Sequence, residues 1–102
     1  MLELRPTCEH CRKPLPPESR EAMICSFECT FCRTCVDDVL HGVCPNCGGG
    51  FCARPVRPSK DWVGGNCLAN HPPGEREVHK PVDPARHARL LAAQNGLPPH
   101  QR

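Results

Sequence analysis

Residues 25–47 read CSFECTFCRTCVDDVLHGVCPNC and hold six cysteines, and an earlier pair, Cys8-x2-Cys11, brings the total to eight. Two thiolates separated by about two to four residues can reach one metal ion from a single tight turn. Eight such thiols make two four-ligand sets, and four cysteines fill every position of a tetrahedral zinc site. The spacing therefore predicts two structural zinc ions and no open coordination position for a substrate water.

A disulfide framework is the main alternative, because ten cysteines in 102 residues is also the composition of small secreted proteins. The N-terminal sequence MLELRP has no basic region followed by an apolar run, and no stretch approaches transmembrane length. Closely spaced cysteine pairs are also poor at joining distant segments. We therefore expect a cytoplasmic protein whose thiols bind zinc, in preference to disulfides or an iron–sulfur cluster.

Composition divides the chain near residue 54. Residues 1–54 hold nine of the ten cysteines and all three phenylalanines, whereas residues 55–102 hold eight of the thirteen prolines. This indicates a double zinc-binding domain over 1–54, followed by a Pro-rich tail that is extended or disordered. Within the tail, Asp83 as a cap, Pro84 at the first position and Asn95 as a stop predict a short helix over 84–94.

The two parts differ in charge. The head has six Lys and Arg against seven Asp and Glu, a charge of −1, and the tail has seven against four, a charge of +3. Eight thiolates on two zinc ions would bring the head to about −5. Because nucleic acid requires a concentrated cationic face, we do not expect the head to bind it, and only the tail is basic.

Local patterns place the cysteines on a small zinc fold with little regular secondary structure. A helix of two to three turns is predicted from Arg33 to His41, with Thr34 available as a cap and Gly42 as a stop. Residues 23–27 are expected to form a strand or hairpin arm, and residues 2–4 a short strand. A helix that leaves the Cys32/Cys35 turn is typical of treble-clef or RING-type zinc domains.

The order of the pairs indicates how they combine. The four pairs are separated by loops of thirteen, two and eight residues. A two-residue gap is too short for two independent neighbouring sites, so an interleaved cross-brace fits better than sequential sites, which remain the alternative. The predicted ligands are Cys8, Cys11, Cys32 and Cys35 at site 1 and Cys25, Cys29, Cys44 and Cys47 at site 2.

This spacing resembles the RING finger, including the Cys-Pro-x-Cys motif at Cys44–Cys47, with Cys29 where a RING more often has histidine. RING fingers that recruit ubiquitin-conjugating enzymes have an apolar residue in the first pair, a bulky aromatic near the end of the helix and a cation after the last ligand. Apart from Pro45, those positions differ here, and Gly48 replaces the cation. We therefore expect neither ligase activity nor any other enzymatic activity, since catalytic zinc needs an open position.

Three stretches carry a closer resemblance: MLELRPTCE at residues 1–9, ICSFECTFC at 24–32 and HGVCPNCGG at 41–49. Together they resemble a family of short bacterial proteins of unknown function, strongly over residues 1–54 and loosely over 55–81. The resemblance implies a bacterial, cytoplasmic, zinc-binding protein. It carries no activity with it.

The sequence thus predicts a non-enzymatic structural zinc protein that binds an unknown protein partner, with no membrane association and no indication of its oligomeric state. Trp62 is either folded onto the head or exposed as an anchor for the partner. Two alternatives remain. The spare thiols of Cys52 and Cys67 suggest a thiol and zinc redox sensor, and the basic tail suggests a nucleic-acid binder.

Overall fold

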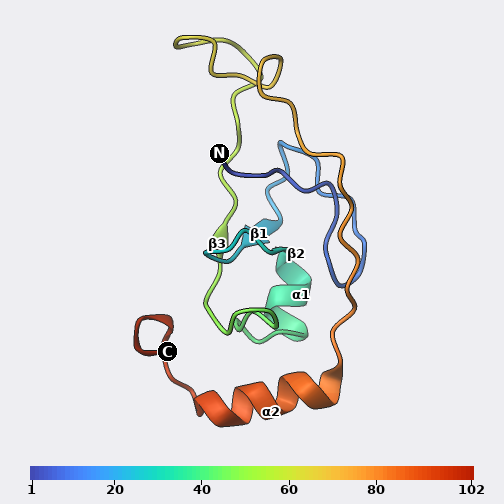
Figure 1. The fold of residues 1–102 in the computed structure, drawn as a ribbon, viewed down its shortest axis with the longest axis vertical. Helices are drawn as coiled ribbons and strands as arrows, with labels where there is room; N and C mark the ends of the chain where they lie inside the picture. Colours follow the sequence, from blue (N-terminus) through green and yellow to red (C-terminus); the bar gives the residue numbers. More distant parts are fainter.

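The computed structural model describes residues 1–102, an elongated molecule of 46 × 27 × 18 Å in which helices and strands are short (Figure 1). This confirms the expectation of a small domain with little regular secondary structure. Neither α-helix has the length and apolar character that a membrane span requires. In chain order the elements are β1 (Ala22–Ile24), β2 (Thr30–Cys32), α1 (Arg33–Asp38), β3 (Cys52–Ala53), α2 (Pro84–Gln94) and a 3-10 turn, η1 (Pro99–Gln101).

The three strands form one antiparallel sheet in the order β2-β1-β3. Met23 pairs with Phe31 on one side and with Ala53 on the other. The β1 strand ends earlier than the sequence predicted, because the chain turns back between Cys25 and Cys29. The Cys25 amide donates to the Cys29 carbonyl at 3.2 Å across this turn. The hairpin therefore brings a cysteine pair to its tip.

The helix α1 starts where the sequence predicted but ends after six residues, at Asp38. Its N-cap is Cys32, which makes no side-chain cap hydrogen bond, so the expected cap by Thr34 is wrong. The helix stops because the Gly42 amide donates back to the Val36 carbonyl at 2.9 Å, with Gly42 at a φ of 75°. The expected strand at residues 2–4 is also absent, and that segment is irregular.

The apolar core is small and built largely from the metal-ligand candidates. Six of the eleven residues in the buried cluster are cysteines. Around them pack Leu15, Phe31 and Leu40, each almost completely buried. Phe31 also meets Phe51 edge to face, with ring centroids 5.6 Å apart. Because so few large apolar groups are buried, hydrophobic burial here is limited, and a bound ion would contribute a large share of the stability.

The side chain of Arg54 is buried directly after β3 and holds two segments of the head together. Its guanidinium donates to the carbonyls of Arg5 at 2.9 Å, Leu15 at 3.1 Å and Pro16 at 3.0 Å. No carboxylate pairs with it, and burial lowers its pKa. Arg54 therefore supplies the hydrogen-bond donors for three loop carbonyls that do not pair in the sheet.

Beyond residue 54 the chain forms an irregular loop, residues 55–73, which we call the distal loop. It then returns beside the N-terminal segment (Figure 1). On the return, the Gly74 amide donates to the Leu4 carbonyl at 3.1 Å and the Lys80 amide to the Glu9 carbonyl at 2.8 Å. The tail is extended, as predicted, and it is ordered against the head by backbone hydrogen bonds. The domain boundary at residue 54 stays a prediction.

An ion pair fastens the same returning segment. Arg76 contacts the Glu3 carboxylate at 2.8 Å, and Arg5 contacts it at the same distance. Hydrogen bonds from Arg76 and then Arg5 lower the pKa of Glu3 to about 2. Glu3 thus stays ionised, and the contact persists, until the pH falls close to that value.

Helix α2 spans Pro84–Gln94 and runs along the end of the head that holds α1 (Figure 1). Asp83 caps it, accepting from the Ala85 amide at 3.0 Å, and Asn95 ends it in the left-handed conformation. Its anchor is His87, buried, whose Nε2 lies 2.8 Å from the Leu40 carbonyl. Packing against the head explains how so short a helix is held.

We predict that Arg54→Met lowers the free energy of unfolding of the metal-loaded protein by about 3 kcal/mol, because three buried or partly buried carbonyls lose their charged donor. Arg20→Met is the matched control, since Arg20 is exposed. Denaturation followed by circular dichroism measures both. Equal midpoints for the two variants would show that the buried guanidinium contributes nothing to stability.

Candidate metal centres

The first cysteine pair lies on a tight turn. The Cys8 amide donates to the Lys13 carbonyl, and the Arg12 amide donates back to the Cys8 carbonyl, both at 2.9 Å. Arg12 closes the turn at a φ of 64°, which is costly for a residue other than glycine. The turn directs the sulfurs of Cys8 and Cys11 to one side.

The last pair repeats this geometry. The Gly48 amide donates to the Cys44 carbonyl at 2.8 Å, and Gly48 has a φ of 76°. Gly48 stands four residues after Cys44, as Arg12 stands four residues after Cys8, so glycine here removes the strain. The Gly49 amide lies 3.4 Å from the Cys47 sulfur and stabilises negative charge on it.

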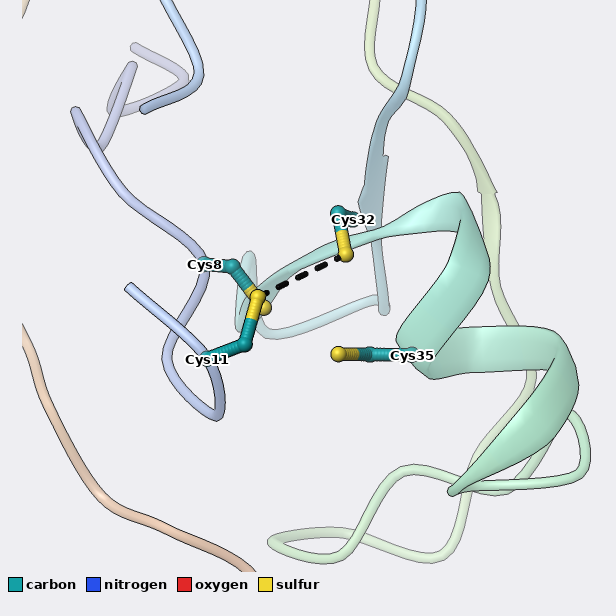
Figure 2. Close-up of side chains that lie close together, drawn as sticks. All are labelled: Cys8, Cys11, Cys32 and Cys35. Carbon is teal, nitrogen blue, oxygen red and sulfur yellow. Dashed lines mark hydrogen bonds between the residues drawn. The ribbon is translucent and has the colours of Figure 1, made fainter. Parts of the chain in front are cut away.

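Four cysteines from distant parts of the chain form the first cluster, Cys8, Cys11, Cys32 and Cys35, with all four sulfurs within 4.8 Å of one another. Figure 2 shows the first pair reaching in from the N-terminal loop and the second from the end of β2 and from α1. Their sulfurs point into one shared space. These are the four residues predicted for site 1.

The spacing of the sulfurs suits a tetrahedral ion. The Sγ atoms of Cys11 and Cys32 are 3.8 Å apart. Two sulfurs held at roughly 2.3 Å from one ion at the tetrahedral angle would also be about 3.8 Å apart. The donor set and this one separation therefore fit a tetrahedral thiolate site of the kind that zinc occupies.

The second cluster contains three of the four predicted residues, Cys25, Cys44 and Cys47. Cys29 is not part of it: its sulfur lies more than 4.8 Å from at least one of these three. Burial raises the pKa of the Cys29 thiol, which lies beside the side chains of Asn46 and Cys25. Cys29 is thus next to the cluster, and its role as the fourth ligand stays a prediction.

Burial makes the thiol form the stable one in the absence of a cation. It raises the pKa of Cys32 and Cys35 in the first cluster and of Cys44 in the second. A divalent cation among these sulfurs would offset that penalty, because it stabilises thiolates directly. Cys11 differs: burial raises its pKa, but hydrogen bonds at Lys13 and from neighbouring thiols lower it by more. The isolated thiolate is therefore disfavoured at Cys32, Cys35 and Cys44.

A buried carboxylate connects the two cysteine turns, and no sequence pattern predicted it. Glu9 lies inside the first pair and is 2% exposed. Its Oε2 accepts from the Thr30 amide at 2.5 Å and from Arg5 at 2.8 Å. Its Oε1 lies 3.5 Å from the Asn46 amide in the last cysteine turn. Glu9 therefore fixes the first turn relative to β2 and to the second cluster.

The two remaining cysteines belong to neither cluster. Cys52 is exposed on β3, where it pairs with Ile24, the neighbour of Cys25. Cys67 is buried in the distal loop, 3.8 Å from the Asn70 side-chain amide. Both are free thiols.

A family model described as a protein of unknown function, DUF1272, matches residues 1–57. The chain belongs to this family. Its membership confirms the resemblance found in the sequence, and the matched region contains both cysteine clusters. An uncharacterized protein of Rhizobium meliloti (strain 1021) is 51% identical over 81 residues, covering 79% of this chain and 89% of that protein. No solved structure matches the chain.

We predict that cysteine substitutions group by cluster and not by order along the chain. Cys8→Ser and Cys32→Ser should each release the same ion, so the double variant should lose no more metal than the worse single variant. The same holds for Cys25→Ser with Cys44→Ser. Metal content per chain, measured on purified protein, tests both pairs.

The matched control is Cys8→Ser combined with Cys25→Ser, which lie in different clusters. This double variant should lose both ions. If instead it loses one ion, while Cys8→Ser with Cys32→Ser loses two, the sites are sequential and the interleaved arrangement is wrong.

Proposed function

We propose that this protein is a non-enzymatic zinc-binding scaffold with a RING-like cross-brace that presents a surface to a protein partner. The observation that carries the proposal is the pairing of the first cysteine turn with the third, as the cluster of Cys8, Cys11, Cys32 and Cys35. Zinc would be held at two sites, with Cys29 completing the second. Four thiolates per ion leave no position for a substrate, which favours a structural role over catalysis.

Zinc is favoured over the alternatives by the donor set. The candidate donors are all cysteine sulfurs, and those of Cys11 and Cys32 lie 3.8 Å apart. Both features suit tetrahedral zinc. All ten cysteines are free thiols, as expected in a reducing compartment. We propose a bacterial cytoplasmic location, which the absence of disulfides and the Rhizobium relative support.

We predict two zinc ions per chain in protein purified without chelator. Removing them should unfold residues 1–54, because binding of roughly 10 to 16 kcal/mol per structural site exceeds what the small core supplies. Elemental analysis gives the stoichiometry, and loss of dispersed NMR signals on adding chelator reports the unfolding. A head that stays folded without metal, or that carries one ion or fewer, contradicts the proposal.

A second candidate function, a thiol and zinc redox sensor, draws on the position of Cys52. This exposed thiol lies one register position from the ligand candidate Cys25. Hydrogen peroxide could convert it to a sulfenic acid and water, and a ligand thiolate could then form a disulfide with it and release zinc. The zinc experiment separates the two functions: for a scaffold, Cys52→Ser leaves zinc retention under dilute peroxide unchanged, whereas protection by this substitution favours the sensor.

The partner surface that we assign is the tip of the distal loop. Trp62 and Val63 are 73% and 71% exposed there. The loop is ordered from within: the Gly65 amide donates to the Asp61 carboxylate at 2.8 Å, and Asn70 donates to the Gly65 carbonyl at 2.9 Å. An indole presented on an ordered loop loses little entropy on binding and is a frequent anchor at interfaces.

We predict that Trp62→Ala abolishes co-purification of the native partner while leaving both zinc ions in place, because the indole makes the largest exposed apolar contact available. Phe27→Ala is the control, since Phe27 is 70% exposed in the turn between β1 and β2 of the head. Affinity purification of tagged protein from the native cell, with zinc content measured in parallel, provides the test. Equal recovery of the partner with both variants would show that the interface lies elsewhere.

A further inference from the structure

A cleft of about 320 Å³ separates the last cysteine turn from the tail. One wall is formed by Pro45 and Asn46 of the head. The other walls come from residues 80–83 and from Arg86, His87 and Leu90 of α2. This volume is at the lower end of the range for small-molecule sites. Neither cysteine cluster contributes to its lining, so the cleft is separate from the metal centres.

The cleft is lined by two positively charged side chains and one carboxylate. Lys80 and Arg86 both line it. The Lys80 ammonium donates to the Asn46 side-chain oxygen at 3.1 Å, which holds it over the cleft, whereas the Arg86 guanidinium has no hydrogen-bond or ion-pair partner. The carboxylate is that of Asp83, and it accepts from two amides at the start of α2. The site therefore favours an anion that can take hydrogen bonds from both sides.

A buried polar atom in the wall lacks a partner. His87 is 4% exposed, and its Nε2 lies 2.8 Å from the Leu40 carbonyl. A carbonyl only accepts, so Nε2 carries the proton. The other ring nitrogen, Nδ1, is buried and has no hydrogen-bond partner. With Nε2 protonated, Nδ1 is an acceptor, and leaving it buried without a partner is unfavourable.

We propose that this cleft binds the phosphate group of a small metabolite, with Arg86 and Lys80 as its cationic donors and His87 in the wall. A carboxylate has two oxygens, which a single guanidinium can satisfy. A phosphate group has at least three acceptor oxygens and a higher charge, and it matches donors that converge from separate segments. The concave shape favours a small molecule over an extended polymer. No cysteine lines the cleft, but Pro45 and Asn46 lie in the turn between Cys44 and Cys47, so the test uses the metal-loaded protein.

Titration of the full-length, metal-loaded protein with inorganic phosphate tests the proposal, followed by ¹H–¹⁵N NMR at constant ionic strength. Saturable shifts are expected at residues 45–46 and 80–90. Arg86→Gln should weaken binding about tenfold, the effect of losing one charge-assisted hydrogen bond. Arg89→Gln is the matched control, because Arg89 is on the same helix but does not line the cleft; it should leave the affinity unchanged.

Three results would overturn the proposal. Shifts that grow without saturation, or that are equal in Arg86→Gln and Arg89→Gln, would show ionic screening only. Sodium acetate that binds as tightly as phosphate would make the cleft a general carboxylate site. A single-stranded DNA oligonucleotide that shifts α2 when phosphate does not would assign this surface to nucleic acid.

Discussion

Convergence of cysteine pairs from distant parts of the chain is the constraint on which the rest of this fold depends. Six of the eleven core residues are cysteines, and few large apolar side chains surround them. A domain of this size with so little apolar burial is marginal without a crosslink or a metal. Secondary structure is accordingly short and irregular, because it serves mainly to bring cysteine sulfurs together in two clusters.

Cysteine spacing was informative because the chemistry behind it is local and strict. A tight turn with two thiols has few uses, and the short gap between Cys29 and Cys32 favoured interleaved over sequential sites. The first cluster accordingly consists of the residues that were predicted together. The second cluster differs from the prediction at Cys29, because the Cys29 sulfur does not lie among the other three. Spacing alone does not report a side-chain direction within a turn, so this detail could not be read from the sequence.

The parts that sequence reasoning missed are long-range and polar. Glu9 and Arg54 are buried charged residues, and each is satisfied by groups from several segments. Nothing in their local sequence distinguishes them from surface residues. The end of α1 was likewise set by a backbone hydrogen bond from Gly42 rather than by the apolar periodicity that extended to His41. The tail is ordered by backbone hydrogen bonds and by His87, contacts that its composition conceals.

For the zinc scaffold proposed above, the interleaved pairing also bears on how the chain would acquire its metal during synthesis. The first four cysteines to leave the ribosome are Cys8, Cys11, Cys25 and Cys29, and these do not form a cluster in the folded protein. A zinc ion captured at that moment would hold the wrong set. The first native site becomes complete only when Cys35 has emerged, and the second only with Cys47. If the clusters hold zinc as proposed, correct assembly would require ligands to exchange on the ion, and the lability of zinc–thiolate bonds would then be as important as their strength.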